Sequence, residues 1–384
     1  MMPEKKKRTA QSAKMARRAK LRRKRRIRRI AWRSALSLMT RIVCVLVAVY
    51  CAGYVGFRGP SQTMGDLLTV SMLETSALQF VPRIYYSKDE VQEIVARNSV
   101  GEMREETNTS LIVIAPPTPE PTPTPDPASM PAETPEPTVT PATASTSTRT
   151  PIIDEDGIQI YELWGGTYHG YMTVVQDPSR VTVGTCRESF NSSAGLVLHE
   201  LAKRYNAVAA INGGAFADTN GGGNGGQPTG LVVSEGKLKH KAEPDSSHNL
   251  VIGFTQDDIL VFGKWTTEQA AKWNLRDAVA FGPALVLNGE AVEAKGISSG
   301  LNPRSAIGQR ADGAVLMLVI EGRQANSLGA TYADIIKTML DFEAVNAANL
   351  DGGSSSMLYY QGDYITNGVV LTGSRKLPTA FIVR

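Results

Sequence analysis

The feature that most restricts this chain is an uncharged run near its N-terminus. Residues Ile42 to Phe57, IVCVLVAVYCAGYVGF, carry no charge, and apolar residues continue back to Leu36. A helix needs about 20 mostly apolar residues to cross a bilayer, and the long side chain of Arg41 can reach the headgroups. The sequence therefore predicts a transmembrane signal anchor over residues 36–57.

A strongly basic block precedes this run and predicts its orientation. Residues 1–41 contain 17 Lys or Arg and one acid, Glu4, and such an excess is typical of a cytoplasmic flank. We expect residues 1–35 to form a cytoplasmic tail and everything after Phe57 to lie outside the cell. A nucleic-acid patch is the competing interpretation of the basic block, and the apolar run that follows it argues against one. A cleaved signal peptide stays open as an alternative to the anchor, although no clear small-x-small cleavage site follows.

Two different spacers are predicted after the span. Residues 58–115 include YYSKDEVQEIVARNS, where Ser87 is a candidate N-cap and apolar residues recur at helical spacing, so a short helix is expected. Residues 116–150 are rich in Pro and Thr and favour an extended linker that could reach about 100 Å, at about 3.1 Å per residue, into a cell wall. A Pro/Thr recognition segment or a glycosylated stalk is the alternative for this composition.

The folded part is predicted to fill residues 151–384. Its 18 basic and 24 acidic side chains give a formal charge of −6, so the basic character of the chain belongs to its N-terminal tail. Many strand-like runs are separated by turn residues, and two helices are clear, at residues 194–205 and 332–342. The pattern predicts an α+β domain on a large, mainly antiparallel or mixed sheet, with glycine-rich loops at strand ends. Cys186 is its single cysteine, so no disulfide can form within the domain.

Polar residues gather in four stretches where predicted strands begin or end. The stretches are INGGAFAD (211–218), FGPALVLNGE (281–290), NPRSAIG (302–308) with VIEGRQ (319–324), and NLDGGSSS (349–356). Taken singly, each is ordinary turn chemistry, because Gly, Asn, Asp and Pro dominate turns for backbone reasons. Together they supply carboxylates, guanidinium groups and amides, and we expect their tips to converge at one end of the sheet.

The ordered set NGGAF, GPALV, NPRSAIG, EGRQ and NLDGGSSSM resembles the phosphodiester glycosidase family over residues 152–384. The resemblance implies cleavage of a sugar-1-phosphodiester between the anomeric carbon and the bridging oxygen, which releases the sugar and a phosphomonoester. It also implies a sugar phosphate or a phosphate-containing glycan as partner, and bacterial members of the family are often anchored at the envelope and sometimes described as exopolysaccharide-related. Glu321 departs from the pattern, because family members commonly carry Asp at that position.

Asp351 and Glu321 are the candidate catalytic carboxylates. One would attack the anomeric carbon or activate water, and the other would stabilise the oxocarbenium-like transition state or bind sugar hydroxyls. Arg304 and Arg323 are candidates for bidentate hydrogen bonds to phosphate oxygens, with structural ion pairs as the alternative. The remaining candidates for substrate binding are Asn212, Gly213, Gly214, Gly352, Gly353 and Ser354.

Other chemistry has less support. A serine nucleophile lacks the G-x-S-x-G pattern, and His169 and His248 are interpreted as surface residues of polar loops. His199 begins an H-E-x-x-H motif in which Lys203 takes the place of the second ligand, so neither a zinc site nor a cofactor is expected. Calcium bound by loop carboxylates stays open. The glycine-rich stretch at residues 219–226 is expected to be mobile.

Two alternatives to an enzyme stay open from the sequence. One is a non-catalytic carbohydrate-binding or exopolysaccharide assembly protein that uses the same pocket. The other is a structural protein of the cell wall that has no ligand.

Overall fold

The computed structural model describes residues 3–75, 77–103, 105–114, 149–190, 193–218, 223–242, 250–367 and 374–384. The chain divides into two units, Met1–Gly65 and Asp66–Arg384, and each is described by itself. Almost all of the predicted Pro/Thr-rich linker, residues 116–150, lies outside the described residues, and so does His248.

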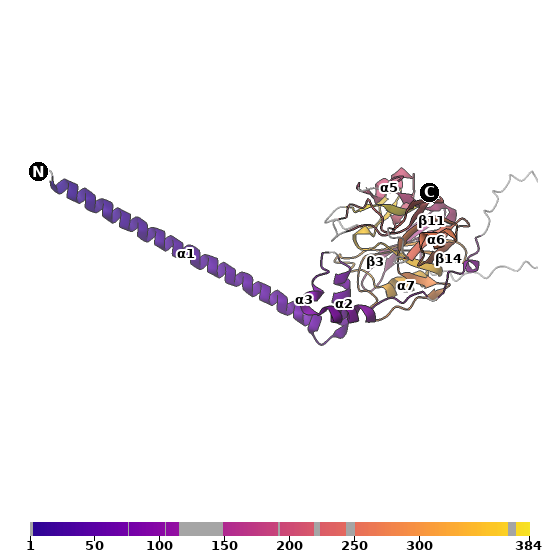
Figure 1. The fold of residues 1–384 in the computed structure, drawn as a ribbon, viewed down its shortest axis with the longest axis horizontal. Helices are drawn as coiled ribbons and strands as arrows, with labels where there is room; N and C mark the ends of the chain where they lie inside the picture. Colours follow the sequence, from indigo (N-terminus) through magenta and orange to yellow (C-terminus); the bar gives the residue numbers. More distant parts are fainter. Residues whose placement is uncertain are drawn as a thin grey trace, which may run out of the picture. The chain divides into compact units, whose positions relative to one another are not determined.

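The first unit is dominated by helix α1 (Pro3–Arg58), which carries both the basic block and the apolar run (Figure 1). Within it, Lys20–Arg58 is long and apolar enough to cross a membrane, with a mean hydropathy of 2.1 in its most apolar window. None of that window is buried. A signal sequence and a membrane span both match this description.

The strands of the second unit form three main sheets and one short pair, and every pairing among the described strands is antiparallel. The largest sheet has the order β1 (Ile153–Glu155), β2 (Ile158–Trp164), β3 (His169–Val175), β15 (Val315–Ile320), β14 (Arg304–Arg310), β16 (Ala344–Leu350), β12 (Ala284–Leu287) and β13 (Glu290–Ala291).

Two five-stranded sheets accompany it. The order of the second sheet is β10 (Leu260–Gly263), β9 (Leu250–Thr255), β11 (Leu275–Phe281), β7 (Val232–Ser234) and β8 (Lys237–His240). The order of the third sheet is β18 (Asp363–Tyr364), β17 (Leu358–Tyr360), β6 (Ala209–Asn212), β20 (Thr379–Val383) and β4 (Val181–Thr185). The short pair joins β19 (Lys376–Leu377) to β5 (Leu196–Val197).

The described helices of the second unit are short. They are the part of α2 (Gln62–Leu73) from Asp66 onward, α3 (Pro82–Tyr85), α4 (Lys88–Arg97), α5 (Leu198–Arg204), α6 (Thr267–Ala271) and α7 (Tyr332–Asp341). The expected α+β class is therefore confirmed, with three separate sheets in place of one.

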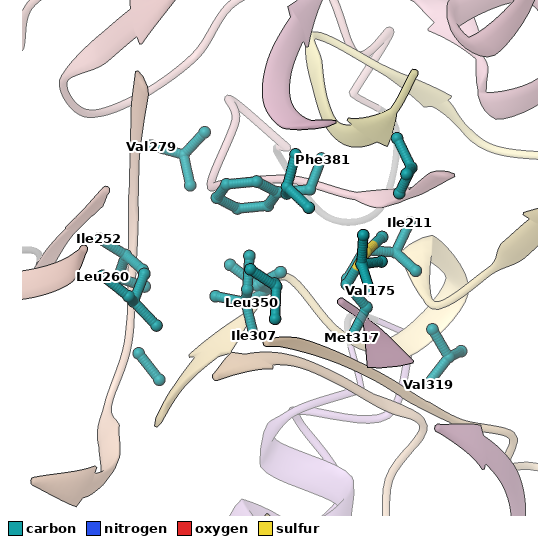
Figure 2. Packing of buried hydrophobic residues seen from close by; sticks show 14 of the residues in the cluster. Val175, Ile211, Ile252, Leu260, Val279, Ile307, Met317, Val319, Leu350 and Phe381 are labelled. Carbon is teal, nitrogen blue, oxygen red and sulfur yellow. The ribbon is translucent and has the colours of Figure 1, made fainter. Parts of the chain in front are cut away.

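The main core lies where residues from all three sheets meet. In Figure 2, side chains such as Phe381 of β20, Ile252 of β9 and Leu350 of β16 point toward one another. Strand β15 is buried on both faces. Because side chains alternate between the two faces of a strand, such a strand needs a continuous apolar run. Met317 packs into the main core, and its neighbour Leu318 packs on the opposite face against the cluster that includes α7.

The helix predictions were partly correct. Helix α7 matches the predicted helix at 332–342, and Thr331 caps it with Asp334 in a capping box. The predicted helix at 194–205 is wrong at its N-terminal side, because residues 196–197 form β5, which pairs with β19 before α5 begins. The short helix expected after Ser87 is confirmed as α4, with Ser87 as its N-cap.

The segment before the linker is more than a spacer, because residues 66–114 pack on the same unit as residues 149–384. The backbone N–H of Gly101 donates to Glu293 O at 2.7 Å, and that of Val113 donates to Ala311 O at 2.8 Å. The side chain of Thr107 bonds both backbone groups of Phe262 at 3.3 Å. The Pro/Thr-rich stretch is therefore flanked on both sides by parts of one folded unit.

Candidate active site

Three of the predicted motifs meet at one edge of the eight-stranded sheet. Strand β14 begins at Arg304, which pairs with Ile320 at the end of β15, and the next residue, Ser305, pairs with Leu350 at the end of β16. Because these neighbours run antiparallel, the start of one strand and the ends of the other two lie side by side. The convergence expected from the motifs follows from this register.

A cavity of about 420 Å³ opens at this edge. Six of the predicted site residues line it: Arg304, Arg323, Asp351, Gly352, Gly353 and Ser354. Its other lining residues are Glu74, Phe216, Asp218, Phe281, Gly282, Asn302, Pro303, Tyr332, Asn349, Ser355 and Arg375. The cavity therefore combines carboxylates with three guanidinium groups.

Asp351 lies directly after β16, with its side chain on the cavity. Burial raises the pKa of its carboxyl to about 6, and hydrogen bonds from Ser355 and the Gly352 N–H, together with Arg375, oppose that rise. A carboxylate with a pKa near neutrality can accept a proton from water or act as a nucleophile. Among the described acids that line the cavity, Asp351 is therefore the best suited to catalysis.

Hydrogen bonds with the NGG motif hold the backbone of Asp351 in place. Asn212 donates through Nδ2 to Asp351 O and accepts from Ser305 Oγ at 2.7 Å, and Gly213 O accepts from the Asp351 N–H at 3.2 Å. A Cβ on Gly213 would lie 2.5 Å from Thr379 Oγ1, so only glycine fits there. Asn212, Gly213 and Gly214 do not line the cavity and instead hold the loop that does.

Arg304 is nearly buried and almost fully bonded. Its Nε donates to Ala330 O at 3.3 Å, and its Nη2 donates to Ser299 O and Gly300 O at 3.1 and 3.3 Å. Its Nη1 forms an ion pair with Glu74 Oε2 at 2.8 Å, so each of its three nitrogens has a partner among the described residues. The guanidinium also lies over the ring of Tyr332, 4.1 Å from its centroid.

Arg323 has more donors left for a ligand. In the described part of the chain, its side-chain hydrogen bonds use Nη2 alone, which donates to Thr75 Oγ1 and Asn302 Oδ1 at 3.2 Å each. Desolvation lowers the pKa of Arg323, and the neighbouring Arg304 and Arg375 lower it further against the opposing effect of Glu74. A ligand anion beside these like charges would be favoured.

A Cβ on Gly353 would lie 3.5 Å from Nη1 and Nη2 of Arg323. Gly353 also has a positive φ of 62°, which favours glycine. The glycine thus lets the guanidinium lie close against the loop that follows Asp351.

Arg375 completes the group of cations, and the motifs did not single it out. Its Nη1 donates to Ser354 Oγ at 2.9 Å, and its Nη2 pairs with Asp218. The guanidinium stacks over Phe216 at 4.9 Å from the ring centroid. The sequence signal was a basic residue in a polar loop, which does not predict a site.

Glu321, the other predicted catalytic carboxylate, does not line this cavity. It is 3% exposed, and its Oε2 lies 2.6 Å from His169 Nδ1 while its Oε1 accepts from Asn367 N at 2.5 Å. The other ring nitrogen of His169 lies 2.8 Å from Glu162 Oε1. His169 is 3% exposed, so its interpretation as a surface residue is wrong.

The glycine-rich stretch is only partly described. Gly223–Gly226 are described, and the backbones of Lys376 and Ser193 lie so close to Gly225 and Gly226 that neither position has room for a Cβ. Among the described residues, no cluster of three or more His, Cys, Asp or Glu forms a metal site.

The fold and the site together define an α+β domain with a polar cavity, lined by three arginines, at the edge of an antiparallel sheet. Residues 205–384 match the sequence model of the phosphodiester glycosidase family.

Similar proteins are distant in sequence. The SPbeta prophage-derived uncharacterized protein YomE of Bacillus subtilis (strain 168) is 31% identical over 175 residues, which are 44% of this chain and 26% of that protein. The match thus spans about a quarter of that relative.

Among solved structures, the catalytic domain of zebrafish N-acetylglucosamine-1-phosphodiester alpha-N-acetylglucosaminidase, auto-inhibited by its pro-peptide, is 22% identical with a TM-score of 0.49. The match covers 63% of this chain and 86% of that one. A hypothetical protein from Synechocystis is 16% identical with a TM-score of 0.44, over 63% and 65% of the two chains.

Proposed function

We propose that this chain is a membrane-anchored, extracytoplasmic glycosidase that hydrolyses a sugar-1-phosphodiester at the bond between the anomeric carbon and the phosphate oxygen. The observation that carries the proposal is the cavity in which Asp351, with its raised pKa, shares a wall with the guanidinium group of Arg323. The match of residues 205–384 to the phosphodiester glycosidase family supports a glycosidase-type activity.

Arg323 is the proposed main phosphate ligand. Its Nε and Nη1 are not used by hydrogen bonds to other described side chains, so they can form a two-point contact with phosphate oxygens. Arg375, which donates to Ser354 Oγ, adds a further positive charge to the cavity. Each nitrogen of Arg304 already has a partner among the described residues, so the proposed role of Arg304 is to hold the cavity wall and not to bind phosphate bidentately.

The proposed reaction breaks the bond between C1 and the bridging oxygen. Water, or Asp351 followed by water, forms the new bond to C1, and the electron pair of the old bond leaves with the phosphate oxygen. A phosphomonoester is a good leaving group once its charge is stabilised, so the guanidinium groups replace much of the general-acid help that ordinary glycosidases need. With a pKa of about 6, Asp351 is mostly ionised at pH 7.

Asp351 is the single proposed catalytic carboxylate in contact with substrate. Glu321 is proposed to support the site from outside the cavity, because His169 and the Asn367 N–H occupy its two oxygens. The structure does not bring these two carboxylates together on the cavity wall. This arrangement also supports the second candidate function, a carbohydrate-binding protein that holds a sugar phosphate without turnover.

The proposed location is the outer face of a cell membrane, and the proposed substrate is a phosphate-containing glycan of the envelope. The apolar part of α1 supports an anchor, and the basic residues before it support a cytoplasmic N-terminus. These features resemble a bacterial envelope protein whose outer domain reaches wall polymers.

The test uses the full chain in detergent micelles with a glyceryl sugar-1-phosphodiester. We expect the wild type to release free sugar and Asp351→Asn to lose at least about 100-fold in kcat, because the amide cannot accept a proton. Asp363→Asn is the matched control, since Asp363 is exposed in β18.

Full activity in Asp351→Asn would contradict the catalytic assignment. Binding of sugar-1-phosphate by a wild type that releases no sugar would support the second candidate function.

A further inference from the structure

Two consecutive residues from before the Pro/Thr-rich stretch contact both predicted phosphate arginines. Glu74 pairs with Arg304 at 2.8 Å, and Thr75 Oγ1 accepts from Arg323 Nη2 at 3.2 Å. Glu74 also lines the cavity that contains Asp351. A part of the chain that the sequence assigned to a spacer thus contributes to the wall of the candidate active site.

The hydroxyl of Thr75 has a fixed direction. It donates its proton to Ser71 O at 3.1 Å, so its lone pairs are left to accept from Arg323. Asn302 accepts from the same nitrogen of Arg323 through Oδ1 at 3.2 Å. Two acceptors on one nitrogen orient the guanidinium, and its other nitrogens stay available for a ligand.

Glu74 fixes the second acceptor. Its Oε2 accepts from Asn302 Nδ2 at 2.9 Å, which turns the oxygen of that amide toward Arg323. Its Oε1 accepts from Ser299 Oγ. The Glu74 carboxylate therefore links Arg304 to the acceptor that orients Arg323.

Residues 66–75 are held in the fold by hydrogen bonds and close contacts. Asp66 is 6% exposed and receives a two-point bond from Arg97 at 2.6 and 2.8 Å, and Asn98 Nδ2 also donates to it at 2.9 Å. Ser71 Oγ accepts from Leu301 N at 3.0 Å and lies so close to Gly300 that no Cβ would fit there. Residues 66–75, held by these contacts, form a fixed part of the cavity wall.

We infer that Glu74 and Thr75 are positioning residues of the active site, and that the catalytic unit therefore includes residues 66–75. The inference rests on the proposed function, since the arginines that they orient are the proposed phosphate ligands. It follows that residues 151–384 alone would carry Asp351 but lack the groups that orient Arg323.

Thr75 provides the cleaner test, because its replacements leave the charge and size of the side chain almost unchanged. We expect Thr75→Val, in the full chain, to raise both KM for the phosphodiester and Kd for inorganic phosphate by about 3- to 10-fold, with kcat within about twofold, as for one lost hydrogen bond. Thr75→Ser, which keeps the hydroxyl, should stay within about twofold of the wild type in all three.

Glu74 provides a second test of the inference. Glu93 of α4, an exposed residue that also precedes the Pro/Thr-rich stretch, is the control. Glu74→Ala should raise KM about 10-fold or more, whereas Glu74→Gln keeps an acceptor for Asn302 and Arg304 and should lose less. Glu93→Ala should have no effect. Thermal unfolding of each variant separates loss of folding from loss of positioning.

Several outcomes would overturn the inference. Unchanged phosphate affinity in Thr75→Val would show that Thr75 does not position Arg323, and higher activity in either Glu74 variant would show that the segment obstructs the site. A wild type that binds phosphate but releases no sugar would refute the enzyme and still leave the Thr75 comparison to decide the inference. A wild type that does neither would refute both.

Discussion

Replacing Asp351 by Asn is expected to stabilise the folded protein at neutral pH while it abolishes catalysis. In the unfolded chain Asp351 releases its proton near pH 3.8, and burial raises that value to about 6 in the folded state. Between these two pH values the folded state binds more protons than the unfolded state, so stability falls as the pH rises. The contribution of Asp351 to stability is full below about pH 4 and is lost as the pH rises through 6. A neutral Asn avoids this loss.

The magnitude follows from the two values. A difference of about two pH units corresponds to about 3 kcal/mol, which is a ceiling because the side chain keeps some contact with solvent. The Asn side chain retains an oxygen to accept from Ser355 and the Gly352 N–H, so most of the hydrogen bonding survives.

The assay is urea unfolding, followed by tryptophan fluorescence, of the wild type, Asp351→Asn and the control Asp363→Asn at pH 4 and pH 7.5. We expect the free energy of unfolding of Asp351→Asn, relative to the wild type, to rise by up to about 3 kcal/mol between the two pH values. The Asp363→Asn control should show almost no change. A relative stability of Asp351→Asn that is the same at both pH values would refute the reasoning.

Three further predictions concern other parts of the site. The kcat/KM of the wild type should rise with pH through about 6 and level off above 7, since the ionised form of Asp351 is the active one; a profile that falls over this range would assign Asp351 as an acid. His169→Ala should lower the free energy of unfolding by about 3 kcal/mol at pH 7, because it leaves Oε2 of the buried Glu321 carboxylate without the imidazole that binds it, and urea unfolding would measure the loss. Gly213→Ala should reduce kcat at least about 10-fold, because its Cβ would displace Thr379 and the loop of Asp351; activity equal to the wild type would show that the loop tolerates the shift.

Much of the fold follows from local patterns. The Asp312-Gly313 dipeptide marks the hairpin between β14 and β15, and the capping residue Thr331 starts α7. The meeting of NPRS, EGRQ and NLDG was also predictable, because neighbouring antiparallel strands bring strand starts and strand ends to the same edge. The signals that the sequence carries most clearly are hydrophobic alternation and turn residues, and both are local.

The rest of the site depends on contacts between distant parts of the chain. Glu74 meets Arg304 from the other side of the Pro/Thr-rich stretch, and nothing in the composition around Glu74 indicates that pairing. Glu321 was predicted to be a catalytic carboxylate because it is the acid of the EGRQ motif, but His169 from β3 binds its carboxylate. The sequence predicts which residues lie at the sheet edge and not which of them face the cavity.

The most direct test of the central claim is hydrolysis of a sugar-1-phosphodiester by the full chain in water enriched in oxygen-18. Cleavage between the anomeric carbon and the bridging oxygen places the heavy oxygen on C1, whether Asp351 activates water or is itself the nucleophile. Mass spectrometry should therefore find the label in the released sugar and none in the phosphomonoester. Label in the phosphate would mean that the bond between phosphorus and oxygen is cleaved, and would contradict the proposed glycosidase mechanism.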